Sequence, residues 1–139
     1  MSSNRFIQLV EDNFGPDTAS LVDVERMHEI MGDEPAELEE ILNLYLDQMD
    51  TNFSKLDAAL AAGNHREVEF IAHNCAGTSA TCGMTAISFP FRELETAGRN
   101  RCLDHAPAML VQAHILFEQM RAVLAQHVPK TLMQTEVQL

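Results

Sequence analysis

The sequence has few positive charges, few aromatic side chains and no long apolar stretch. Only 9 of its 139 residues are Lys or Arg, against 21 Asp or Glu, which gives a formal net charge of -12. Nucleic acids and anionic membrane surfaces attract basic proteins, so this balance argues against both as partners. No apolar run approaches the roughly 20 residues that cross a bilayer, and the first residues lack the pattern of a secretory signal peptide.

Cysteine is also scarce, and its spacing excludes the common cysteine-based scaffolds. The three cysteines are Cys75, Cys82 and Cys102, an odd number with no C-x-x-C pair. Neither a disulfide framework nor a zinc site is therefore expected. Because no secretory signal is present either, we expect a protein of the reducing cytoplasm.

The residues that are abundant are those that favour helices. Hydrophobic residues make up 46% of the chain and charged residues 22%, a balance typical of one ordinary globular domain. Ala, Leu, Glu, Met and Gln are frequent, whereas β-branched and aromatic residues are sparse. This composition predicts an all-α fold.

Cap and stop residues mark the beginnings and ends of five expected helices. Asp23 is a suitable N-cap for a short first helix, and Gly32 is a suitable stop. Asp33 is the expected N-cap of the second helix. Pro90 lies inside the fourth helix, which is therefore either kinked there or begins late, at Ser88. The expected ranges are 23–31, 33–62, 64–82, 84–97 and 106–127.

The four long helices are amphipathic and are joined by short loops. This pattern predicts an up-down antiparallel four-helix bundle, to which the short first helix is an N-terminal addition. The bundle is expected to span residues 21–128, and we expect it to be a monomer. Residues 1–20 are interpreted as an N-terminal arm and residues 129–139 as a C-terminal tail.

His73 occupies an unusual position on the third expected helix. At 100° per residue it lies on the opposite side from the apolar Ile71 and Cys75, so it should face solvent. Exposed helical positions usually carry long charged side chains, whereas the residues that follow on this face are small. They are Ala76, Gly77 and Ala80. A glycine inside a helix costs about 1 kcal/mol relative to alanine, which is tolerable where another body approaches the backbone.

Residues 72–83, AHNCAGTSATCG, resemble the motif of histidine phosphotransfer domains, A-H-x-h-K-G-x-(S/A)-x-x-x-G with h an apolar residue. His73, Gly77 and Gly83 stand at the motif's histidine and glycines. Residues 91–99, FRELETAGR, are similar to the family's following helix, which often reads L-x-x-L-E-x-x-(G/A)-R. The resemblance covers roughly residues 20–127 and supports the same four-helix bundle.

The resemblance implies a phosphorelay intermediate of two-component signal transduction. His73 would accept a phosphoryl group from the aspartyl phosphate of one receiver domain and pass it to another. The chain would be a phosphocarrier rather than an enzyme, with no cofactor or metal of its own, because the receiver supplies Mg²⁺ and the acidic residues. The expected partners are receiver domains of response regulators or of hybrid sensor histidine kinases.

Helical geometry and the resemblance together suggest which residues surround the phosphoacceptor. Those expected to shape the site are Ala76, Gly77, Ala80 and Gly83. Those expected to contact the phosphoryl group or the partner are Glu69, Phe70, Arg92 and Arg99. Glu69, one turn before His73, is a candidate to accept a hydrogen bond from the imidazole. Phe70 belongs either to the core or to an exposed apolar rim.

One position departs from the family pattern. Where the family usually has lysine, three residues after the histidine, this chain has Ala76. Arg92 and Arg99 are candidates to replace that cation. The departure also keeps an alternative function open, a helical adaptor that docks a receiver domain or a kinase through the same surface without transferring phosphate.

A metal-binding bundle is a further alternative. Glu25 and His28 form an E-x-x-H pair of the kind found in di-iron carboxylate bundles. Such bundles need two of these pairs together with further inward glutamates, and the sequence has no second pair. We therefore expect no metal site.

Overall fold

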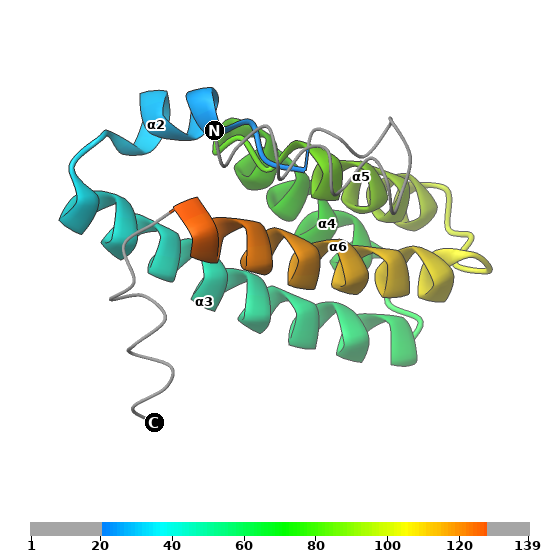
Figure 1. The fold of residues 1–139 in the computed structure, drawn as a ribbon. Helices are drawn as coiled ribbons and strands as arrows, with labels where there is room; N and C mark the ends of the chain where they lie inside the picture. Colours follow the sequence, from blue (N-terminus) through cyan, green and yellow to red (C-terminus); the bar gives the residue numbers. More distant parts are fainter. Residues whose placement is uncertain (1–20, 128–139) are drawn as a thin grey trace.

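The computed structural model describes residues 21–127, and every regular element in that range is an α-helix (Figure 1). The all-α class and the number of helices agree with the sequence-based expectation. The predicted arm, residues 1–20, and the predicted tail, residues 129–139, lie outside the described residues. The helices are α2 (Val24–Met31), α3 (Pro35–Ala61), α4 (His65–Thr81), α5 (Thr85–Arg99) and α6 (Ala106–His127).

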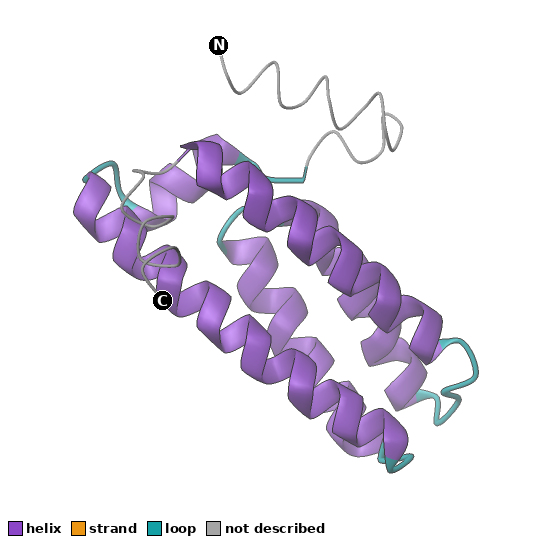
Figure 2. Cartoon of the chain, turned by 60° about the horizontal axis from the view of Figure 1, so that its bottom comes forward, coloured by secondary structure: helices purple, strands orange, loops and turns teal. Residues whose placement is uncertain are grey.

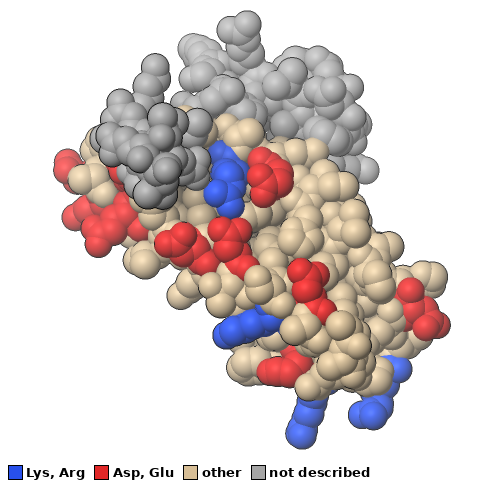
Figure 3. All heavy atoms as spheres, turned by 90° about the horizontal axis from the view of Figure 1, so that it is seen from below, with Lys and Arg blue, Asp and Glu red and all other residues tan. Residues whose placement is uncertain are grey.

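The four long helices pack side by side and alternate in direction along the chain, which is the predicted up-down bundle (Figures 1 and 2). The short helix α2 lies at one end of the bundle (Figure 1). On the face shown in Figure 3, Lys and Arg side chains lie singly among the described residues rather than in a continuous basic patch. Within residues 21–127, no helix is both long and apolar enough to cross a membrane.

The bundle interior is filled by the apolar stripes of all four long helices. Phe53 of α3 packs against Phe91 of α5 and Phe117 of α6, with ring centroids 5.7 and 5.2 Å apart. His114 of α6 stacks on the same Phe53 ring at 4.0 Å. Burying one such large side chain stabilises a fold by about 1.5–3 kcal/mol, so this cluster ties three helices together.

The beginning of α3 differs from the prediction by one residue. Glu34 rather than Asp33 is the N-cap residue, and Pro35 opens the helix. Proline suits the first helical position because its missing N–H would have no partner there. Asp33 instead accepts a contact from His28, whose Nδ1 lies 3.1 Å from the carboxylate.

Helix α5 runs through Pro90 from Thr85 to Arg99, so a late start at Ser88 is wrong. Pro90 is only five residues from the first helical residue, and its missing N–H therefore removes a single backbone bond near the helix start. Ser88 donates its hydroxyl to the Thr85 carbonyl at 2.6 Å within the same turn.

Helices α4 and α5 approach each other closely at Gly98. A Cβ atom at this position would lie 2.6 Å from the backbone nitrogen of Glu69 and 2.7 Å from the carbonyl oxygen of His65. Both distances are below van der Waals contact, so only glycine allows the two backbones to pack this tightly. As a result, the polar side chains at the end of α5 reach those of α4.

Candidate functional site

His73 projects from the middle of α4, and 68% of its side chain is exposed. The outward direction predicted from helical geometry is therefore confirmed. One ring nitrogen, Nδ1, lies 2.9 Å from Oε2 of Glu95 on α5. The Glu95 side chain is only 12% exposed, so an almost buried carboxylate fixes one edge of an exposed imidazole.

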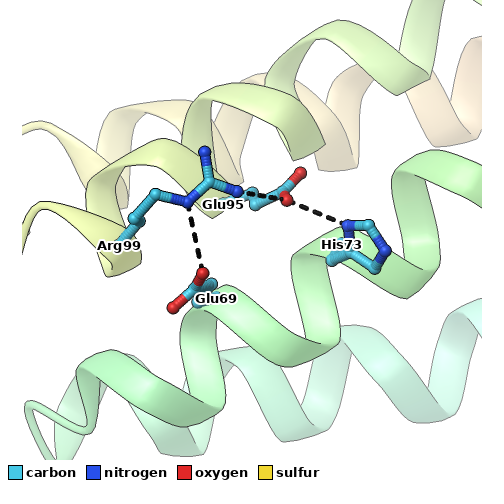
Figure 4. A network of polar contacts seen from close by, with 4 residues as sticks. All are labelled: Glu69, His73, Glu95 and Arg99. Atoms are coloured by element: carbon cyan, nitrogen blue, oxygen red, sulfur yellow. Dashed lines mark hydrogen bonds and ion pairs between the residues drawn. The ribbon is translucent and has the colours of Figure 1, made fainter.

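Glu95 belongs to a chain of charged side chains that crosses from α5 back to α4 (Figure 4). The Nη2 group of Arg99 donates to the same Glu95 oxygen at 2.7 Å. The Nε group of Arg99 donates to Oε2 of Glu69 at 3.3 Å. Arg99 therefore joins a carboxylate of its own helix to a carboxylate of the histidine's helix.

The contact with Glu95 determines where the imidazole carries its proton. An ionised carboxylate can only accept hydrogen bonds, so Nδ1 must be the protonated nitrogen. In the neutral ring the other nitrogen, Nε2, then keeps a free lone pair, and the ring turns it away from Glu95 (Figure 4). An exposed histidine in this tautomer presents a nucleophile to solvent.

The prediction that Glu69 accepts from the imidazole is wrong, because Glu95 holds that place and Glu69 binds Arg99. The sequence did carry a signal for this arrangement. Glu95 and Arg99 are four residues apart, a spacing at which a carboxylate and a cation meet on one helix face. What the spacing does not reveal is which residue of another helix lies opposite them.

Two shallow hollows flank His73 and differ in charge. The first lies toward α5 and contains both acidic and basic side chains; it is lined by Asn64, Arg66, Glu67, Glu69, Phe70, His73, Glu95 and Arg99. The second extends along α4 and contains no Asp, Glu, Lys or Arg; it is lined by His73, Asn74, Gly77, Thr78, Thr81 and Cys82.

The residues expected to form a smooth exposed strip do not all face outward. Gly77 is exposed, and nothing in the structure lies within 4 Å of a Cβ atom placed on it. Ala76, however, is only 1% exposed and Ala80 is half-buried. Ala76 is instead buried in the bundle, as is Ala72 one turn earlier. The expectation that Ala76 lies on the open face is therefore wrong.

Gly83 has a different role from the one expected. It adopts a φ of 88°, and a Cβ atom there would lie 2.6 Å from the carbonyl oxygen of Asp23. Asp23 also donates its backbone N–H to the Gly83 carbonyl at 2.7 Å. Gly83 thus permits α2 to dock at the end of α4, and it does not line either hollow beside His73.

Of the remaining expected residues, Phe70 and Arg99 line the charged hollow together with His73. Phe70 is 64% exposed and lines the charged hollow. Of the two positions expected for it, it therefore occupies the exposed rim and not the core. Arg92 is exposed on α5 and lines neither hollow. Phe89 of α5 is also exposed, at 66%.

Cys75 lies on the buried side of α4 and has no place in this site. Burial raises the pKa of its thiol to about 12, and a hydrogen bond from the Asn52 side chain offsets only part of this effect. A thiol that stays protonated is a poor nucleophile and a poor metal ligand. Among residues 21–127, no group of three or more His, Cys, Asp or Glu side chains is arranged to hold a metal ion.

Comparisons with known proteins agree with the fold and identify a family. The sequence model of the Hpt domain family matches residues 40–127, the range that contains His73, Glu95 and Arg99. No curated protein matches the chain. Histidine-containing phosphotransfer protein B (HptB) from Pseudomonas aeruginosa PAO1 has a similar crystal structure, with a TM-score of 0.72 and 24% sequence identity over 77% of this chain and 93% of that chain. This likeness shows that the two share a fold.

Proposed function

The chain belongs to the Hpt domain family, and from this premise we propose that it relays phosphoryl groups between receiver domains with His73 as the phosphoacceptor. One observation carries the proposal: His73 is exposed, and its Nδ1 is bound by Glu95 while its Nε2 is turned outward. Members of this family are phosphocarriers rather than independent enzymes. We therefore assign the catalytic acidic residues and their Mg²⁺ to the receiver.

The transfer step follows from the tautomer of His73. The lone pair of Nε2 attacks the phosphorus atom of the receiver's aspartyl phosphate and forms an N–P bond. The O–P bond breaks, and its electron pair leaves with the aspartate carboxylate. The ring then carries a positive charge beside the Glu95 carboxylate, which stabilises it. In the second transfer a carboxylate oxygen of the second receiver's aspartate attacks the phosphorus atom and forms an O–P bond. The N–P bond breaks, and its electron pair returns to Nε2.

The surroundings of His73 suit docking by apolar and uncharged contacts. Gly77 leaves the backbone of α4 open one turn beyond the histidine. Phe70 presents an exposed ring on the other side, and exposed aromatic side chains are enriched where proteins bind each other. A receiver domain that packs on Phe70 and Gly77 would place its phosphoaspartate over Nε2.

A phosphotransfer assay tests the proposal. The purified chain is incubated with receiver domains of the same organism that carry labelled aspartyl phosphate, and His73→Gln is tested beside it. We expect acid-labile, base-stable label on the wild type and none on His73→Gln. The exposed His105 provides a matched control, because His105→Gln should accept label as the wild type does. Equal labelling of His73→Gln would overturn the assignment.

The adaptor alternative rests on Ala76, which leaves the site without the lysine usual in the family. It predicts that a receiver binds the chain with an unchanged affinity for His73→Gln, while no phosphate reaches either protein. Binding of the receiver can be measured by calorimetry in the same samples. Binding without label would favour the adaptor, whereas label on the wild type alone excludes it.

A further inference from the structure

We propose that Arg99 and Glu69 are positioning residues that hold the Glu95 carboxylate on Nδ1 and thereby select Nε2 of His73 as the attacking atom. This inference rests on the proposed phosphotransfer function and extends it to two residues that do not touch the reacting atoms. Arg99 would therefore not act as a direct substitute for the missing lysine.

The bonding pattern supports an indirect role for Arg99. A single oxygen of Glu95, Oε2, receives both the His73 Nδ1 contact at 2.9 Å and the Arg99 Nη2 bond at 2.7 Å. The position of that oxygen is therefore set jointly by the imidazole and the guanidinium. Because Nε2 points away from Glu95, a phosphoryl group on it would lie on the far side of the ring from the guanidinium (Figure 4).

Glu69 binds a second donor of the same guanidinium, Nε. Its bond to Arg99 Nε, at 3.3 Å, ties the α5 arginine to the helix that carries the histidine. Guanidinium is planar and presents its donors at fixed angles, so one arginine can hold two carboxylates in a defined relation. Gly98, next to Arg99, brings the two helix backbones close enough for this bridge to form.

A fixed carboxylate matters because histidine has two neutral tautomers. In water the free side chain favours the tautomer that is protonated on Nε2, in which this nitrogen has no free lone pair. A carboxylate held at Nδ1 stabilises the opposite tautomer through a charge-assisted hydrogen bond. If Arg99 no longer restrains Glu95, its side chain gains rotamers and the tautomer preference weakens.

The hollow itself supplies matched controls. Arg66 and Glu67 line it together with Arg99 and Glu69, and within the described residues neither side chain takes part in the His73–Glu95–Arg99 chain. Arg66→Gln therefore removes the same charge as Arg99→Gln from the same hollow. Glu67→Gln likewise removes the same charge from this hollow as Glu69→Gln.

The test combines ¹⁵N nuclear magnetic resonance of the His73 ring with single-turnover phosphotransfer from a labelled receiver. Arg99→Gln should raise the fraction of the Nε2-protonated tautomer and slow transfer about tenfold, with receiver binding unchanged. Arg99→Lys should keep part of the wild-type tautomer preference and part of the wild-type transfer rate, because lysine reaches one carboxylate but lacks the planar group that binds two. Arg66→Gln should leave the tautomer as in the wild type.

Glu69→Gln should shift the tautomer in the same direction as Arg99→Gln but by less, and Glu67→Gln should not shift it. The proposal is overturned if Arg99→Gln keeps the wild-type tautomer, or if the Arg66 and Glu67 variants shift it equally. The tautomer is read without any receiver. A failure here therefore leaves the labelling of His73 intact, and a failure of labelling leaves the tautomer result intact.

Discussion

Two glycines near His73 lie in opposite surroundings. Gly98 is pressed against the backbone of α4, with no room for a single added carbon, whereas Gly77 faces open space. On the Gly98 side, the charged chain through Glu95 crosses between helices. On the Gly77 side, the second hollow contains no Asp, Glu, Lys or Arg side chain.

The two sides of the site meet two requirements of a phosphoacceptor histidine, a fixed ring and an accessible nitrogen. The sealed side orients the imidazole through contacts made within the chain. The open side leaves the attacking nitrogen accessible to another protein. Substitutions on the sealed side should therefore affect stability and the transfer step, and those on the open side should affect partner binding.

The largest expected effect comes from removing the carboxylate of the sealed side. Glu95→Ala leaves Nδ1 without an acceptor, so we expect phosphotransfer to slow by about tenfold to a hundredfold, as for the loss of a positioned polar group. Single-turnover kinetics measures the rate, and Glu93→Ala, an exposed neighbour on α5, serves as the control. An unchanged rate would show that Glu95 has no role in the transfer.

The next effect concerns the close approach of the two helices. In Gly98→Ala the added methyl group must push α5 from α4, which should lower the free energy of unfolding by about 1–3 kcal/mol despite the better helix propensity of alanine. Urea denaturation followed by circular dichroism measures the change. A stabilised variant would contradict the tight packing at this position.

The same substitution at the open glycine should have the opposite sign. Gly77→Ala meets no neighbour, so the gain in helix propensity should raise the free energy of unfolding by up to about 1 kcal/mol. The methyl group would, however, stand between α4 and a docked receiver, and the affinity for that receiver should fall. Calorimetric titration tests this second part, and unchanged affinity would place the partner elsewhere.

The smallest expected effect concerns Cys75, which lies on the buried side of α4. Its pKa is about 12 in the folded chain, against 9.0 for an ordinary thiol. Between these values the unfolded chain has released the thiol proton and the folded chain retains it, so stability falls as the pH rises. The loss should be about 0.8 kcal/mol at pH 9.5. Cys75→Ala should show a shallower decline in denaturation experiments at pH 8 and 9.5.

Sequence reasoning predicted the helices, the bundle and the exposed direction of His73. These features are properties of single helices, because caps, stops and apolar periodicity act within about a turn of the residues concerned. The one-residue error at Asp33 arose because Pro35 sets the start of α3. The motif at residues 72–83 also identified the family that the match over residues 40–127 confirms.

The partners of His73 were decided only by the packing of α5 on α4. Glu69 is near His73 in sequence, yet the imidazole binds Glu95, 22 residues away. Ala76 was expected on the open face, yet the packing of the bundle buries it. Helical periodicity fixes the angle at which a side chain leaves its own helix. Which other helix lies there, and how near, depends on how all the apolar stripes fit together in the bundle.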